Sequence, residues 1–163
     1  MSSYSAASPA DTRGGFFHRL IATDGSGATA LLRITLAIIM FPHGAQKVLG
    51  WFGGYGFTGT MGFFTGQMKI PYIFALLAII AEFLGAIGLL VGLLTRVAAF
   101  GIACVMVVAV ATTHLPNGFF MNWTGQQKGE GFEYHLLVIA IAVFLMIRGA
   151  GAASLDRMLS NRR

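Results

Sequence analysis

The stretch RITLAIIMFPHGAQK, residues Arg33–Lys47, is apolar over most of its length but carries Arg33, His43 and Lys47. It lies within a run, 28–48, that is long enough to cross a hydrocarbon core of roughly 30 Å as a helix. The whole chain of 163 residues is 56% hydrophobic and only 10% charged, with a mean hydropathy of +0.73. A water-soluble domain does not present that composition to solvent. Because the apolar residues form long runs and not alternating patterns, the sequence predicts an all-α integral membrane protein.

Four apolar runs divide the chain into three parts. They predict a bundle of four transmembrane helices within residues 28–149, with spans at about 28–48, 71–94, 97–113 and 132–147. The second and third runs are separated by little more than Thr95 and Arg96, so we expect a tight hairpin there, eased by Gly92.

The two ends of the chain are predicted to be tails. Residues 1–27 are expected to form an N-terminal tail that is either disordered or includes a short interfacial helix around Phe16, Phe17, Leu20 and Ile21. Residues 150–163 are expected to form a basic C-terminal tail.

The distribution of Lys and Arg predicts the orientation. With four spans both termini share one side, and that side holds a set of arginines: Arg13, Arg19, Arg96, Arg148, Arg157, Arg162 and Arg163. The opposite side holds Lys69 and Lys128, with Lys47 at a helix end. Since cytoplasmic ends of spans carry the excess of Lys and Arg, we expect both termini to be cytoplasmic. Topology alone therefore accounts for the net charge of +5, and no nucleic-acid partner is implied.

Both predicted outer connections, 49–70 and 114–131, are rich in glycine and aromatic residues, including Trp51 and Trp123. These residues form either an aromatic belt at the headgroup level or the entrance for a flat hydrophobic molecule. In the second span, Gly88 and Gly92 have the G-x-x-x-G spacing that allows close helix contacts in lipid. That contact lies either within the bundle or between the subunits of a homo-oligomer.

A polar stripe runs along the first span. At 100° per residue, Arg33, Met40, His43 and Lys47 fall within an arc of roughly 80°, and the stripe is about 21 Å long. The second span contributes Glu82, which lies between Arg33 and His43 in depth. An ionised carboxylate facing lipid at mid-bilayer costs at least about 2.5 kcal/mol, so we expect Glu82 to pair with one of these two residues.

Two readings of the stripe remain open. In the structural reading, Arg33 and Lys47 extend to the headgroups and Glu82 joins two helices. In the functional reading, the stripe lines an outward-opening cavity whose mouth includes His114, Glu133 and His135.

Other chemistry has little support in the sequence. No close His spacing or Glu-x-x-His pattern predicts a metal site. The single cysteine, Cys104, excludes an internal disulfide and is expected to be a small packing residue. No haem motif or flavin fingerprint is present, so redox chemistry would need a bound quinone or a partner protein as the electron carrier.

Three ordered segments resemble the DoxX family of small bacterial four-helix membrane proteins. They are LLRITLAIIMFPHGAQKVLGWFGG (31–54), IIAEFLGAIGLLVGLLTRVAA (79–99) and EGFEYHLLVIAIAVFLMIRGAGAASLDRML (130–159). The resemblance implies a multi-pass protein of the bacterial plasma membrane, of a kind described as an oxidoreductase component. More distant relatives include the membrane subunit of thiosulfate:quinone oxidoreductase, which implies a quinone as the electron acceptor.

The sequence thus leaves three hypotheses about function. The first is an oxidoreductase-associated subunit that binds quinone or a similar lipid-soluble ligand through Arg33, His43, Lys47, Glu82, His114 and Trp51, and that works with redox partner proteins. The second is a carrier or channel for protons or a small solute along the same stripe. The third is a non-catalytic assembly or lipid-handling protein.

Overall fold

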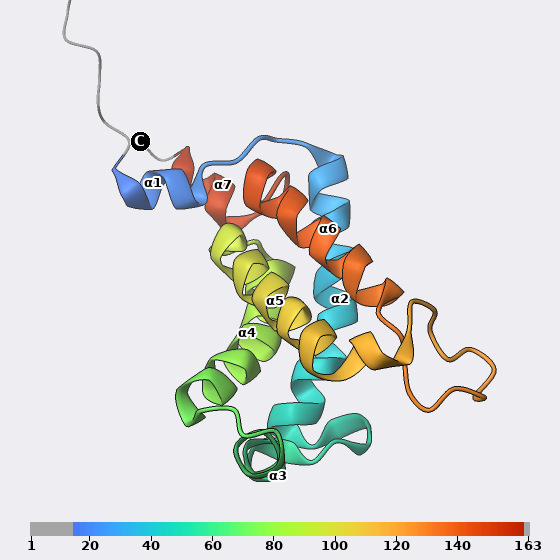
Figure 1. Ribbon diagram of the computed structural model, residues 1–163. Coiled ribbons are helices and arrows are strands. Elements are labelled where there is room, and N and C mark those ends of the chain that lie inside the picture. Colours follow the sequence, from blue (N-terminus) through green and yellow to red (C-terminus); the bar gives the residue numbers. More distant parts are fainter. Residues whose placement is uncertain (1–14, 162–163) are drawn as a thin grey trace, which may run out of the picture.

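The computed structural model describes residues 15–161, and within this range every regular element is helical (Figure 1). The all-α prediction is therefore confirmed, while the part of the predicted N-terminal tail before residue 15 lies outside the described residues. The α-helices are α1 (Phe16–Ile21), α2 (Gly27–Leu49), α3 (Gly56–Gly62), α4 (Tyr72–Val91), α5 (Thr95–Ala109), α6 (Glu133–Arg148) and α7 (Leu155–Ser160). Short 3₁₀ turns occur at Trp51–Gly53 and Leu115–Asn117, and π-helical turns at Phe63–Gln67 and Val110–His114.

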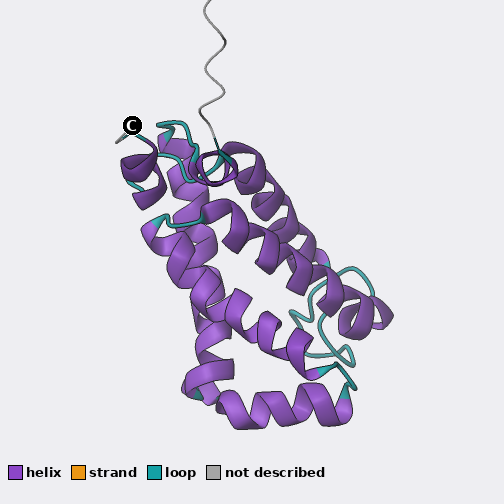
Figure 2. Cartoon of the chain, turned by 90° about the vertical axis from the view of Figure 1, so that its left-hand side faces the viewer, coloured by secondary structure: helices purple, strands orange, loops and turns teal. Residues whose placement is uncertain are grey.

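The four longest helices pack side by side. Helix α2 contacts α4 and α6, while α5 lies between α4 and α6, which closes the bundle (Figures 1 and 2). Its core is made of apolar side chains with almost no exposed surface, including Leu36, Met40, Leu89, Ile102 and Leu145. Within residues 15–161, three helical segments are long and apolar enough to cross a membrane: Gly27–Leu49, Tyr72–Val91 and Thr95–Asn117. Helix α6 is shorter, with 16 residues.

The turn between α4 and α5 is the tight hairpin that the sequence predicts. Gly92 has a φ of 68° and Leu94 a φ of 49°, both in the left-handed region. The carboxylate of Asp156 accepts hydrogen bonds from the backbone N–H groups of Leu94 and Thr95, at 2.8 and 2.9 Å. A residue near the C-terminus therefore caps the first turn of α5, where the free N–H groups and the helix dipole favour an anion.

The segment after α6, predicted as a basic C-terminal tail from residue 150, packs against the bundle. Ala150, Ser154 and Asp156 are all buried. A Cβ added at Gly92 would lie 2.4 Å from the Cβ of Ser154, so the chain crosses the α4–α5 turn closely and only glycine fits there. The sequence could not reveal this packing because it depends on contacts between residues about 60 positions apart.

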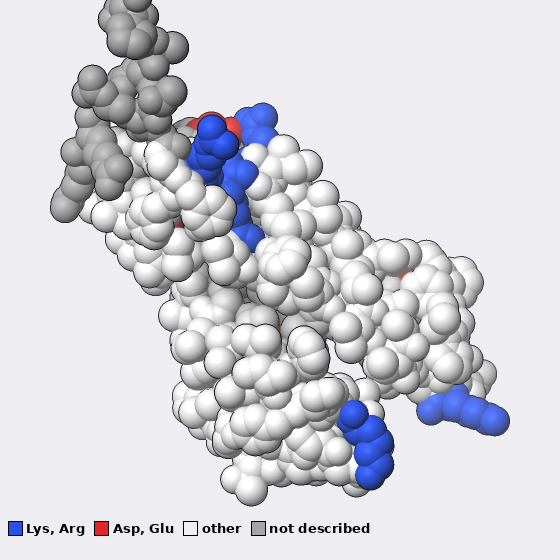
Figure 3. Space-filling model, turned by 60° about the vertical axis from the view of Figure 1, so that its left-hand side comes forward, with Lys and Arg blue, Asp and Glu red and all other residues white. Residues whose placement is uncertain are grey.

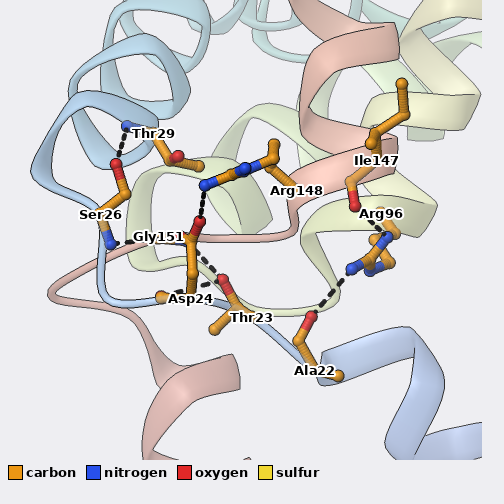
Figure 4. Close-up of polar contacts among 9 residues, drawn as sticks. All are labelled: Ala22, Thr23, Asp24, Ser26, Thr29, Arg96, Ile147, Arg148 and Gly151. Carbon is orange, nitrogen blue, oxygen red and sulfur yellow. Dashed lines mark hydrogen bonds and ion pairs between the residues drawn. The ribbon is translucent and has the colours of Figure 1, made fainter.

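The connection before α2 is tied to the same end of the bundle (Figure 4). Thr23 Oγ1 accepts from the backbone N–H of Gly151 at 2.7 Å, and Arg148 forms an ion pair with Asp24. Arg96 donates to the carbonyl oxygens of Ala22 and Ile147, each at 3.0 Å. We call this region, with α1 and α7, the α7 end of the bundle.

The opposite end, which we call the α3 end, carries the two aromatic-rich connections. Figure 2 shows the α3 segment lying across the bundle and not along it. Met61 of α3 is buried against Ala75 and Ile79 of α4, while Tyr55 and Phe63 are exposed. The connection is therefore ordered and helical, with an apolar face on the bundle and aromatic side chains at the surface.

Gly88 and Gly92 both make contacts within the chain. A Cβ added at Gly88 would lie 3.1 Å from the carbonyl oxygen of Leu93, and one at Gly92 would meet Ser154 and Arg33. These glycines thus serve the α4–α5 turn, and a homo-oligomer stays a prediction.

Candidate functional site

An ion pair between Lys47 and Glu82 lies inside the helical bundle near its α3 end. Lys47 belongs to the last turns of α2 and Glu82 to the middle of α4. The side chain of Glu82 is only 5% exposed and that of Lys47 is 24% exposed. A buried carboxylate needs such a partner, because an isolated ion in an apolar interior is strongly unfavourable.

This pairing corrects the expected partner of Glu82, which was Arg33 or His43. Side chains on a helix tilt toward its N-terminus, so the long stem of Lys47 leads back along α2 into the bundle. Lys47 consequently reaches the depth of Glu82 and does not extend outward to the headgroups. Sequence spacing gave the correct helix face but not the depth that the ammonium group reaches.

Close packing of α2 on α4 brings the two charges within reach. A Cβ added at Gly44 would lie 2.6 Å from the Cα of Phe83, so the two backbones are in contact at this point. The rings of Phe41 and Phe83 stack beside it, with centroids 5.9 Å apart. Gly44 thus sets the helix separation next to the ion pair.

Arg33 does not belong to this site. It is fully buried, and its guanidinium donates only to backbone carbonyls: Leu89 (2.5 Å), Leu90 (2.9 Å), Ala150 (2.8 Å), Ala152 (3.3 Å) and Ala153 (2.9 Å). The carbonyls at the end of α4 lack helical partners, and a cation there also interacts favourably with the helix dipole. The prediction that Arg33 lines the cavity is wrong, because the C-terminal segment folds over it.

The predicted polar stripe is therefore interrupted. Leu36, Ala37 and Met40 lie between Arg33 and His43 along α2, and each is at most 1% exposed. This apolar layer separates the Arg33 cluster at the α7 end from the ion pair at the α3 end.

Three histidines and a tyrosine form a row that begins beside the ion pair. The ring centroids of His43 and Tyr134 are 6.2 Å apart, those of Tyr134 and His135 are 5.4 Å apart, and those of His135 and His114 are 4.0 Å apart. His114 Nδ1 donates to the carbonyl oxygen of Glu130 at 2.9 Å. We call these four residues the histidine row. Its members come from α2, from α6 and from the π-helical turn that follows α5.

Tyr134 is the member that sequence reasoning missed. Its hydroxyl donates to the sulfur of Met40 at 3.8 Å, and the negative charge of Glu82 acts on it. The signal was its position between Glu133 and His135, both predicted for the cavity mouth. The other predicted mouth residue, Glu133, accepts instead from the backbone of Met121 at 2.9 Å and from Trp123 Nε1 at 3.2 Å.

Trp51 lies outside this group. It is 54% exposed and its ring contacts that of Phe52 in an edge-on arrangement, with centroids 6.4 Å apart. Its position suits the surface of the α3 end. The structure thus brings together His43, Lys47, Glu82 and His114 but neither Arg33 nor Trp51.

The surface above the part of the molecule that holds α3 is uncharged and hollowed in Figure 3. A hollow at this end is lined by Tyr55, Gly59, Gly62, Phe63 and Gln67. His43 lies at the surface, while Glu82 is buried.

Cys104 is exposed on α5 and is not the packing residue we expected. Within residues 15–161, no group of three His, Cys, Asp or Glu residues could hold a metal ion.

Comparisons with known proteins place the chain. The DoxX family model matches residues 28–115, which include His43, Lys47, Glu82 and His114. The protein named "Putative oxidoreductase CatD" of Bacillus subtilis (strain 168) is 28% identical over 128 residues, covering 78% of this chain and 84% of that protein. No solved structure matches. Since the family model covers more than half of the chain, this protein belongs to the DoxX family.

Proposed function

We propose that this protein is a quinone-binding subunit of a membrane oxidoreductase, with the ligand held beside Lys47 and Glu82. The observation that carries the proposal is the buried ion pair, which lies next to the histidine row in an otherwise apolar bundle. Ionisable residues inside membrane helices are rare and tend to mark ligand or proton sites. The name of the Bacillus subtilis relative supports a role in oxidation and reduction.

The residues present suit a flat ligand with two carbonyl groups. The ammonium of Lys47 has N–H groups beyond the one bonded to Glu82, and the ring of His43 can donate a hydrogen bond. Phe41 and Phe83 supply an apolar, aromatic wall for a ring. A bound quinone would supply reversible uptake of electrons and protons. The chain's own residues would orient its carbonyl groups and exchange protons with them, and a partner protein would deliver or take the electrons.

The proposal includes four transmembrane helices in the bacterial plasma membrane with both termini in the cytoplasm. Arginines gather at the α7 end, namely Arg19, Arg96, Arg148 and Arg157, whereas Lys69 and Lys128 lie toward the α3 end. In Figure 3 most of the basic side chains likewise gather at one end of the molecule. The positive-inside rule then makes the α7 end cytoplasmic. Helix α6 rises about 24 Å, which a locally thinner bilayer accommodates.

The interrupted stripe argues against the carrier hypothesis. A carrier for protons or solutes needs a polar path across the whole bundle, and the buried Leu36, Ala37 and Met40 block that path in this conformation. A ligand site that opens at one end needs no such path.

Binding of a short-tailed benzoquinone to the full chain in lipid nanodiscs tests the proposal. We expect saturable binding that weakens about tenfold or more in the double variant Lys47→Met/Glu82→Gln, which removes both charges without leaving one buried alone. Lys69→Met, a lysine outside the site, is the matched control and should bind as the unaltered chain does. Equal binding by the double variant and the control would contradict the proposal.

A further inference from the structure

Three of the chain's four histidines lie together at the α3 end, although they come from separate segments of the sequence. The fourth, His18, lies in α1 at the other end. Histidine is the side chain best suited to moving protons near neutral pH, because one ring nitrogen can accept a proton while the other donates one. The proposed ligand site does not use His114 and His135. Their position beside His43 therefore indicates a further role for these two residues.

The spacing within the histidine row suits proton transfer. His135 and His114 are in ring contact, with centroids 4.0 Å apart. The steps from His43 to Tyr134 and from Tyr134 to His135, at 6.2 and 5.4 Å between centroids, are short enough for a direct contact or one bridging water. Each member can both accept and donate a hydrogen bond.

His135 has a buried nitrogen that the fold does not use. The residue is 6% exposed, and its Nδ1 has no hydrogen-bond partner within the described part of the chain. Buried polar nitrogens are almost always satisfied by protein or by ordered water, and an orphan needs an explanation. A water between His135 and its neighbours in the row would satisfy this nitrogen and complete the path.

The row joins the ion pair to the surface. At the end next to the ion pair, His43 lies one helical turn before Lys47, and the charges of Lys47 and Glu82 both act on it. At its outer end, His114 Nδ1 bonds the carbonyl of Glu130, a surface residue. The other ionisable groups nearby are Glu133, which is held by Trp123 and the backbone of Met121, and the exposed Lys128.

We infer that the histidine row is a proton route between the Lys47–Glu82 pair and the aqueous surface at the α3 end. This inference rests on the proposed function and adds the side of the protein with which protons are exchanged. For each pair of electrons delivered to a bound quinone by a reducing partner, two protons must reach its two oxygens. His43 and the Lys47–Glu82 pair would hold these protons and supply them, and the row would replace them from the surface; oxidation of the quinol would return them by the same groups. The buried Leu36, Ala37 and Met40 close the route toward the α7 end.

The test follows protonation of Glu82 after a rapid acid jump. The full chain is held in lipid nanodiscs with a saturating short-tailed benzoquinone, and the carboxyl infrared band is assigned with Glu82→Gln. We expect His135→Phe to slow the appearance of this band by about tenfold or more, since it removes the central relay group. His135→Gln, whose side chain is polar but does not titrate, should slow the appearance of the band as well. This variant replaces His135→Phe in the test if the Phe variant fails to fold. His18→Gln is the matched control and should have no effect.

The outcomes separate the inference from the proposed function. If the quinone binds and His135→Gln protonates Glu82 as fast as the unaltered chain, the route is wrong while the ligand site stands. If no quinone binds, the proposed function fails, and the same acid jump without quinone decides the route: slowing in the His135 variants but not in His18→Gln supports it, and equal rates overturn it.

Discussion

At the scale of single residues, Arg33 and Lys47 show how two cations on one helix face take different roles. Arg33 bonds only backbone carbonyls at the α7 end, and Lys47 pairs with Glu82. The planar guanidinium satisfies several carbonyls at once, whereas an ammonium is a compact charge that suits a single carboxylate. The first role is structural, and the second leaves N–H groups of Lys47 that Glu82 does not bind.

Arg33→Lys should therefore destabilise the protein without altering the proposed ligand site. Lysine cannot reach all five carbonyls, and losing at least two charge-assisted hydrogen bonds should lower the free energy of unfolding by about 3 kcal/mol or more. Thermal unfolding in detergent measures the effect. The control is Arg148→Lys, whose side chain is 51% exposed in its pair with Asp24 and should cost at most about 1 kcal/mol. Equal melting temperatures for the two variants would refute the role assigned to Arg33.

Gly44→Ala should disturb the site through helix spacing. The added Cβ would meet the backbone of Phe83, so α2 and α4 must separate and draw Lys47 away from Glu82. We expect a loss of about 1–3 kcal/mol in stability and weaker quinone binding. Gly62→Ala is the control, since a Cβ there meets nothing within 4 Å. If Gly44→Ala matched this control in both measurements, the close contact would not matter.

At the scale of elements, the short helix α7 stabilises the start of α5. Asp156 is buried and both of its carboxylate oxygens accept backbone N–H groups of the α4–α5 turn. Helix α7 is only six residues long, and its structural role is to position the carboxylate of Asp156. The C-terminal segment is thus part of the fold.

Asp156→Asn should loosen this end of the bundle. The amide can accept one N–H but presents a donor to the other, which costs about 1–3 kcal/mol. Limited proteolysis should then cleave the segment after α6 faster than in the unaltered chain. Asp24→Asn, in a partly exposed ion pair, should have a much smaller effect. Equal cleavage in both variants would show that the cap at α5 does not hold the segment.

At the scale of the whole molecule, the two ends of the bundle differ in chemistry. The α7 end is closed by backbone hydrogen bonds and carries most of the arginines, whereas the α3 end holds the ion pair, the histidine row and the aromatic connections. An excess of arginine at one end is typical of a membrane protein with a fixed orientation.

The orientation can be tested with single cysteines in a Cys104→Ala background. Leu159→Cys on α7 and Thr124→Cys in the connection before α6 both replace exposed residues, so neither should disturb packing. We expect an impermeant thiol reagent added outside intact cells to label Thr124→Cys only, and Leu159→Cys to react after lysis. Labelling of both positions from the same side would contradict the four-span arrangement.

The sequence predicts the helices well and the site in part. Apolar run lengths place α2 and α6 within a residue or two of their observed bounds, because burying the backbone in lipid demands long helices. Periodicity also puts His43 and Lys47 on one face. Periodicity cannot give the direction of a long side chain, so the predicted partner of Glu82, Arg33 or His43, was wrong. It also cannot reveal contacts between distant segments, so the burial of Arg33 and the placing of Tyr134 beside His43 emerge only from the fold.

The most direct measurement of the central claim is an experimental density map of the protein extracted in native-membrane nanodiscs, with mass spectrometry of the small molecules that copurify. We expect ordered density of a flat ring beside Lys47 and His43, a quinone in the mass spectrum, and loss of both in Lys47→Met/Glu82→Gln. A well-ordered ion pair with only lipid or protein around it, and no quinone above the level found with the double variant, would contradict the account.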